Sequence, residues 1–349
     1  MGKKPVLAFS VAMVASLQAP VAASQALSAD LAPIAPPAEI APYIKNDHFF
    51  PGNYEWLRGA FSDASEREVA AYRNIIAWRQ KCRANDLKRA RSEIRSLGIS
   101  PGSSLDTMPY KTLTCGQVSA LPEPINLDDW NGFKHDVAVV RPIVEGYLAA
   151  VASSEKSGYM DDPDIRFALA ARVMAEQTLR AGLDWPAEES GRNDVQGPLT
   201  PQQNGILVAQ IAIALQERDQ ENTAWLKEVV RQHGWPKRSE FGDTVIKMAW
   251  LLVQHADADP LFQVQALRLM EPLAVTGEAN KTDYAFLFDR VMLKLIGKQR
   301  FATQLTCKGG KLVPLPLEDE AGVEARRRKM GIDSLADYEA RTLKEAGPC

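Results

Sequence analysis

The sequence lacks the short motifs that identify common enzyme classes. It contains no GxSxG, HExxH, Walker A or GxGxxG pattern, so it predicts no nucleophile elbow, zinc-protease helix or nucleotide-binding loop. It has only four cysteines and no CxxC or CxxH spacing, which argues against a structural zinc site. No internal repeat of fixed period is present, so a solenoid is not expected. The sequence alone therefore names no reaction.

An excess of basic residues is also missing. The chain has 41 Lys and Arg against 44 Asp and Glu, a formal net charge of -3. Without residues 1–23 two lysines are lost and no acids, which leaves 39 against 44 and a net charge of -5. This balance argues against a nucleic-acid partner. The apolar content of 46% is typical of a globular protein.

The first 23 residues have the pattern of a secretory signal. Lys3 and Lys4 precede an apolar run over residues 6–17, and Val-Ala-Ala at 21–23 provides a cleavage site. The run is shorter than the ~20 residues that a bilayer requires. We therefore expect cleavage after Ala23, a mature chain that begins near Ser24 in the periplasm, and no membrane span after cleavage.

The cysteines lie at widely separated positions, Cys82, Cys115, Cys307 and Cys349. An even number in an exported chain predicts two disulfides, although four cysteines permit three connectivities. We favour Cys82 with Cys115 and Cys307 with Cys349, because each pair then lies within one half of the chain.

The composition divides the chain after the signal into three regions. Residues 24–52 are rich in proline and alanine, which predicts an extended tether, although Tyr43, Phe49 and Phe50 are apolar enough to pack. Residues 53–155 are expected to form an amino-terminal helical region that packs on a helical domain over residues 156–349.

Capping signals indicate where several helices begin. Ser65 and Glu68 form a capping-box pattern that opens a helix toward residue 82; a second segment covers 86–97 and ends at Gly98. An N-cap residue followed by proline predicts helix starts near 163, 201 and 260. Apolar spacing predicts further helices at about 133–154, 219–233, 243–256, 283–297, 319–330 and 334–346.

Interruptions of these helices are also predicted. Pro142 and Pro272 should kink or break their segments. One hairpin is expected, over 302–307 and 311–315 around Gly309-Gly310. The predicted fold is all-α, a multi-helix array with one small β-hairpin near the C-terminus.

Polar residues concentrate between His233 and Gln304. Asp289 has apolar neighbours at every helical contact position, so its carboxylate should be buried and needs a partner outside its own helix, with His255, Gln263 or Arg290 as candidates. Gln263 shows the same pattern more weakly. Either a structural polar network or a ligand pocket would explain these positions.

Helix termination accounts for part of the remaining pattern. In HGWP, Gly234 suits a helix C-cap and Pro236 blocks continuation, while the macrodipole favours His233 in the last turn. Asp259 is expected to cap the next helix, which weakens the alternative of a metal site built from His255, Asp257 and Asp259. The arginine run at 326–328 is expected on a solvated helix face.

The segments HGWP, AWLLVQHADADPLFQ, DYAFLFDRV, GKQRFATQ and PLPLEDE followed by RRRKMGI resemble a bacterial domain-of-unknown-function family with HGWP and QHAD hallmarks. The resemblance covers about residues 165–345. Where that family has a pattern similar to Tyr-Gly before Thr-Gln, this chain has Phe301-Ala302. The resemblance implies that one site or core contains Trp235, Gln254, His255, Asp257, Gln263, Asp289, Arg290, Thr303 and Gln304.

Two functional hypotheses follow. The first is an exported helical binding or interaction module whose polar network shapes a pocket or core for an unidentified small molecule or protein. The alternative is a periplasmic hydrolase or lyase in which His255 is the general base and Asp289 orients it, with His233 as a further catalytic candidate. We expect no cofactor and no bound metal in either case.

Overall fold

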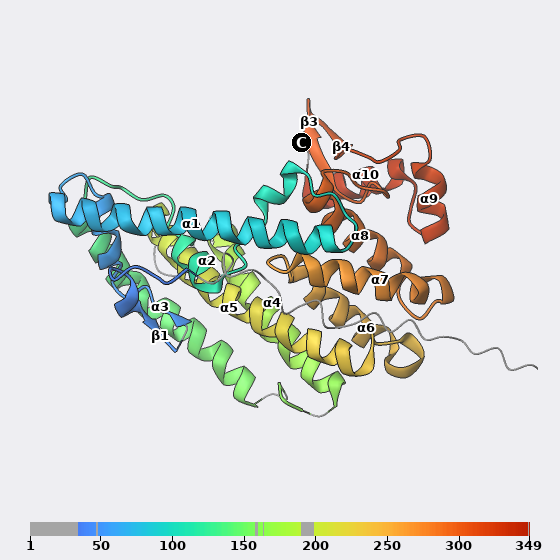
Figure 1. The fold of residues 1–349 in the computed structure, drawn as a ribbon, viewed down its shortest axis with the longest axis horizontal. Helices are drawn as coiled ribbons and strands as arrows, with labels where there is room; N and C mark the ends of the chain where they lie inside the picture. The colour runs from blue at the N-terminus through green and yellow to red at the C-terminus, as the bar shows by residue number, and fades with distance from the viewer. Residues whose placement is uncertain (1–33, 47, 158–159, 163, 190–198, 348) are drawn as a thin grey trace, which may run out of the picture. The chain divides into compact units, whose positions relative to one another are not determined.

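The computed structural model describes residues 34–349 apart from 47, 158–159, 163, 190–198 and 348. The described chain is all-α, as the sequence predicts (Figure 1), and it has two small antiparallel strand pairs where one hairpin was expected. The long helices are α1 (Glu66–Ser96), α3 (Trp130–Ser157), α4 (Ile165–Glu189), α5 (Pro201–His233), α6 (Arg238–His255), α7 (Pro260–Thr276) and α8 (Lys281–Ile296). The shorter elements are β1 (Ile44–Lys45), β2 (His48–Phe49), η4 (Glu55–Ala60), η5 (Ser103–Thr107), α2 (Leu113–Ser119), β3 (Leu305–Lys308), β4 (Lys311–Pro314), α9 (Val323–Met330) and α10 (Leu335–Ala346).

Side-chain caps set the predicted helix starts. The Ser65 hydroxyl accepts from the backbone N–H of Glu68, and the Glu68 carboxylate accepts from the N–H of Ser65 at 2.8 Å, which completes the capping box of α1. Asp259 accepts from the N–H of Phe262 at 3.1 Å and opens α7. The sequence correctly predicts these starts and the start of α5 at residue 201. Pro163 lies outside the described residues, and the helix expected there begins at Ile165.

Several predicted interruptions are wrong. α1 is a single helix of 31 residues where two segments were expected. It continues because the Asp86 carboxylate, buried in its middle, accepts from the N–H and hydroxyl of Thr112 at 2.9 and 2.8 Å. α5 likewise runs unbroken for 33 residues. α3 and α7 continue through Pro142 and Pro272, so neither proline breaks its helix.

Residues 34–46 and 48–52 pack against the helices, where an extended tether with packing only around Tyr43, Phe49 and Phe50 was expected. Ile40 and Phe49 are buried in an apolar cluster with Trp56 and Trp78. β1 pairs with β2, and the indole N–H of Trp78 donates to the carbonyl of Ile34 at 3.3 Å. The large aromatic side chains provide enough apolar contact to order this proline-rich stretch.

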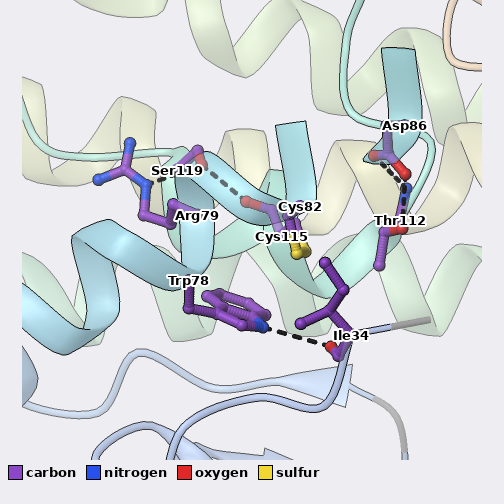
Figure 2. Close-up of a disulfide and its surroundings, with 8 residues drawn as sticks. All are labelled: Ile34, Trp78, Arg79, Cys82, Asp86, Thr112, Cys115 and Ser119. Atoms are coloured by element: carbon purple, nitrogen blue, oxygen red, sulfur yellow. Dashed lines mark hydrogen bonds between the residues drawn. A yellow bond between two sulfur atoms is a disulfide. The ribbon is translucent and has the colours of Figure 1, made fainter. Parts of the chain in front are cut away.

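Both favoured disulfides are present. Cys82 in α1 is bonded to Cys115 in α2, which fastens the short helix to the long one (Figure 2). Beside this bond the Arg79 guanidinium donates to the Ser119 hydroxyl at 3.0 Å (Figure 2). Cys307 in β3 is bonded to Cys349 at the end of the chain. The hairpin itself forms as predicted, with Cys307 opposite Leu312.

The buried apolar residues form two clusters. One contains Ile75 and Trp78 from the first half of α1, with side chains of α3 and the first half of α5. The other contains Ala90 and Ile94 from the second half of α1, with side chains of α6, α7 and α8. Between them, α4 and α5 carry buried polar residues, among them Arg172, Glu176 and Asn222. This polar layer is where the candidate site lies.

Candidate functional site

A cavity of about 500 Å³ opens beside the polar layer. Its walls come from α1, the segment before α2, α4, α5 and the α6–α7 loop. Charged side chains of both signs line it: Arg89, Glu93, Lys111, Arg180, Asp219, Lys227, Asp257 and Asp259, together with His255. The size lies within the range of about 300–1,000 Å³ typical of small-molecule sites.

His255, at the end of α6, pairs with a buried glutamate of α4. Its Nδ1 lies 2.7 Å from Oε1 of Glu176, whose side chain is fully buried, while the imidazole keeps 12% of its surface exposed. Burial would raise the pKa of Glu176, but its contacts with His255, Gln177 and Arg180 together outweigh burial and lower that pKa below its ordinary value. An ionised carboxylate at Nδ1 leaves Nε2 as the imidazole nitrogen available to a ligand.

Arg180 links Glu176 on α4 to Asp219 on α5. Arg180 contacts Glu176 through Nε and Asp219 through Nη2, the latter at 2.8 and 3.0 Å. Burial raises the pKa of Asp219 to about 7, with Arg180 opposing and Glu176 adding to the rise. Asp219 therefore changes charge near neutral pH inside the cavity wall.

Asp257 belongs to a second group of paired charges in the cavity wall. Its carboxylate lies 2.6 Å from Nη2 of Arg290 and also contacts Nζ of Lys294, both on α8. Burial would raise its pKa, but Lys294 and Arg290 outweigh burial and lower the pKa of Asp257 to about 2. The Gln263 amide donates to Asp257 and to the carbonyls of Val253 and Gln254 at 3.1–3.2 Å, so it ties the end of α6 to α7.

Asp289 is buried and bonded outside its helix, as predicted, but to none of the predicted partners. Its carboxylate accepts from the backbone N–H groups of Arg300, Phe301 and Thr303 at 2.7–3.1 Å. These contacts replace the expected pairing with His255, Gln263 or Arg290. The expected dyad of His255 and Asp289 therefore does not form in the described structure; Glu176 occupies the position beside the imidazole.

The loop over residues 299–304 is held from its other side as well. The fully buried Arg327 guanidinium donates to the carbonyls of Phe301 and Ala302 at 2.6 and 3.0 Å. The Gln299 amide donates to the carbonyls of Gln304 and Leu315 and accepts from the N–H of Gln304. Arg327 was expected on a solvated face; it is buried because its N–H groups satisfy carbonyls that no helix or strand satisfies.

Ala302, one of the two residues at which this chain differs from the pattern it resembles, has an unusual backbone conformation. Ala302 has a φ of 53° and is fully buried. A left-handed backbone favours glycine, so alanine is strained at this position. Its strain is maintained by the bonds on both sides of the loop, from Asp289 and Arg327.

The remaining predicted site residues lie in different regions of the structure. His233 is exposed at the end of α5 and lies outside the residues that line the cavity, while Trp235 is buried in the second apolar cluster. Thr303 and Gln304 belong to the Asp289 loop, and the Gln304 amide donates to the Thr303 hydroxyl at 3.2 Å. The one shared site that the resemblance implies is thus two clusters, one around His255 and Asp257 and one around Asp289.

The sequence analysis missed Glu176, Arg180 and Asp219. One signal was available for Glu176: Leu169 and Leu183 lie seven residues before and after it, so it occupies the apolar stripe of α4. The signal is weaker than that of Asp289, because Arg172 and Arg180 stand at the positions four residues before and after Glu176. Asp219 falls in a polar stretch of α5 and carries no comparable signal.

The metal alternative has no support from the geometry. His255 pairs with Glu176, Asp257 with Arg290 and Lys294, and Asp259 with Lys227 at 2.7 Å. Across the described part of the chain, no group of three or more His, Cys, Asp or Glu side chains is placed to hold a metal ion.

Among the residues that the structure describes, one helix has the length and composition of a membrane span. Residues Trp130–Glu155 of α3 meet both criteria, and 22% of their most apolar window is buried. The same helix contributes Phe133, Val137 and Val140 to the first apolar cluster.

Comparison with known proteins gives one match. The model of a family of unknown function, DUF6624, matches residues 164–347, which is more than half of the chain and includes α4 to α10. No curated protein and no solved structure matches the sequence. Glu176, Asp219, His255, Asp257 and Asp289 all lie within the matched residues, whereas Arg89, Glu93 and Lys111 lie outside them. The chain is a member of the DUF6624 family.

Proposed function

We propose that the protein is a binding module for a small polar ligand that carries both a positive and a negative group. The observation that carries this proposal is the cavity of about 500 Å³ beside His255, which is walled by four cations and four carboxylates. Charges of both signs in one recess favour a zwitterion over a simple anion or cation. Amino acids and dipeptides are the simplest ligands of this class.

His255 gives the proposal a sharp test, because the chain offers a second histidine as control. Amino acids and dipeptides are titrated into the protein by isothermal calorimetry, followed by the variants His255→Ala and His233→Ala. We expect at least ~10-fold weaker binding for His255→Ala and unchanged binding for His233→Ala. Equal affinities in both variants, or no binding by any zwitterion of the panel, would rule out this ligand class for the cavity.

A second candidate function is acid–base catalysis, as a hydrolase or lyase. It is favoured by the pair of His255 and Glu176 together with Asp219, because burial raises the pKa of that carboxyl to about 7. In this version Glu176, rather than Asp289, orients the general base, and Asp219 is the acid. The lining includes no serine or cysteine, so this version uses water or direct proton abstraction instead of a serine or cysteine nucleophile.

Turnover separates the two candidates. Esters and amides of the ligands that bind are incubated with the parent protein and with Asp219→Asn. Hydrolysis that is lost in Asp219→Asn while binding remains would support catalysis. Binding by the parent protein without hydrolysis would support the binding module instead.

We also propose that the chain is exported to the periplasm and acts there without a membrane span. The signal-like residues 1–23 lie outside the described residues, and the two disulfides are compatible with an oxidising compartment. Amino-terminal sequencing of soluble periplasmic protein should begin at Ser24. Thiol counting on the denatured, unreduced protein should find no free thiol; four free thiols or a membrane-bound chain that retains Met1 would contradict the proposal.

A further inference from the structure

A second cavity lies on another part of the family region. It has a volume of about 440 Å³ and is bounded by the end of α7, the start of α8, the 299–304 loop and α9. Its lining residues are Glu271, Ala274, Val275, Lys281, Tyr284, Arg300, Phe301, Arg326, Lys329 and Met330. It shares no lining residue with the His255 cavity.

The body of this cavity is apolar. Ala274, Tyr284 and Phe301 are buried and line it, and Val275 stands 75% exposed at its rim. A mostly apolar lining with a few polar groups is typical of sites for small molecules with a hydrophobic body. An apolar side chain as exposed as Val275 is also available to contact a ligand.

The charges around the cavity are unequal. Four lining residues are cations, Lys281, Arg300, Arg326 and Lys329, and one is an acid, Glu271. Arg300 and Arg326 already pair with Glu318 and Asp319, at 2.9 and 2.8 Å. Within the described residues, Lys281 and Lys329 take part in no ion pair, and both are exposed. These two lysines provide the positive charge available to a ligand.

We propose that this cavity binds a small amphiphilic carboxylate, with its apolar body against Tyr284 and Phe301 and its carboxylate at Lys281 and Lys329. Charge complementarity selects the carboxylate over a neutral or cationic head group. The phenol of Tyr284 stays protonated, because burial and Glu271 raise its pKa to about 12, so it adds no negative charge to the wall.

Three ligands with one tail and different head groups test the charge requirement. Octanoate, octanol and octylammonium are titrated by calorimetry into the full protein below their aggregation concentrations. We expect octanoate to bind at least ~10-fold more tightly than octanol, and octylammonium to bind most weakly. Equal binding of the three, or no binding of octanoate at millimolar concentration, would overturn the proposal.

Variants then locate the binding. Lys281→Met with Lys329→Met should weaken octanoate binding ~10-fold and leave octanol binding unchanged. The matched control is Lys308→Met with Lys311→Met, which removes two exposed lysines of the hairpin outside the cavity. Val275→Glu should weaken octanoate binding by placing a negative charge at the rim. If the Lys281/Lys329 variant loses no more affinity for octanoate than the control pair, or if His255→Ala weakens octanoate binding, octanoate binds elsewhere and the proposed site is refuted.

Discussion

The two buried polar clusters of this protein use their charges in different ways. Around the 299–304 loop, Asp289 accepts backbone N–H groups and Arg327 donates to backbone carbonyls. Beside the cavity, His255, Glu176, Arg180 and Asp219 contact one another through their side chains. The first cluster fixes the path of the chain, whereas the second presents groups that can change protonation or exchange partners.

The difference matters for how buried charge is interpreted. Asp289 and Glu176 are both fully buried, and both lie on the apolar face of a helix. Burial therefore does not distinguish a structural carboxylate from a functional one. The partner does: a backbone amide offers no contact to a ligand, whereas an imidazole at the edge of a cavity keeps a second ring nitrogen that can contact one.

The largest expected effect is on the loop. Asp289→Ala leaves three buried backbone N–H groups without their acceptor and should lower the free energy of unfolding by about 3–5 kcal/mol. Urea denaturation measures this change. The control is Glu318→Ala, which removes a half-exposed ion pair with Arg300 and should cost less than about 1 kcal/mol. Similar losses for both variants would mean that Asp289 does not hold the loop.

Ala302, the residue with the strained backbone in the same loop, should be sensitive to the shape of the side chain that replaces it. Ala302→Val introduces a β-branched side chain at a positive φ in a fully buried site and should cost about 2–3 kcal/mol. Ala302→Gly should remain within about 1 kcal/mol of the parent, because relief of backbone strain offsets the lost methyl group and the extra freedom of the unfolded chain. Denaturant melts of both variants check the order. Tolerance of valine would show that the loop can change its path.

The polar cluster beside the cavity should make the stability of the protein depend on pH. The native carboxyl of Asp219 has a pKa of about 7, above its unfolded value, so the native state holds this proton more tightly. Through this group, stability should fall with a slope of at most about 1.4 kcal/mol per pH unit between about pH 4 and pH 7, and should level off above that. Asp219→Asn should remove that slope. Parallel stability–pH curves for parent and variant would contradict it.

The smallest effect on stability is expected at His255. Its imidazole is partly exposed, and Glu176 keeps Arg180 and Gln177 as partners without it. His255→Ala should therefore lower the free energy of unfolding by no more than about 1 kcal/mol, close to the exposed His233→Ala. A loss as large as that of Asp289→Ala would remove the distinction between the two clusters.

The sequence predicted the local features of the fold well. Caps such as Ser65 and Asp259 act within one turn, so their signals lie within a few residues. The burial of Asp289 followed from its helical neighbours for the same reason. The favoured disulfide pairs and the hairpin also proved correct.

The partners of the buried charges could not be predicted in this way. Glu176 lies on α4 and His255 at the end of α6, and only the packing of those helices brings them together. The unbroken course of α1 depends on Thr112, a residue from another element that satisfies Asp86. Contacts between residues that are far apart in the sequence therefore decide which polar residues are structural. These contacts cannot be read from a single sequence.

The length of α1 has a consequence for how the family region can be isolated. At about 1.5 Å per residue this helix extends about 46 Å, and its halves belong to different apolar clusters. Ala90 and Ile94 help to complete the cluster of α6, α7 and α8, and the N–H of Gly102 donates to the carbonyl of Leu295 in α8. A fragment cut at the first matched residue, 164, would expose this apolar surface and open one wall of the His255 cavity. The border of the evolutionary family is therefore not a border of independent folding, and expression of the matched region alone should yield aggregated protein.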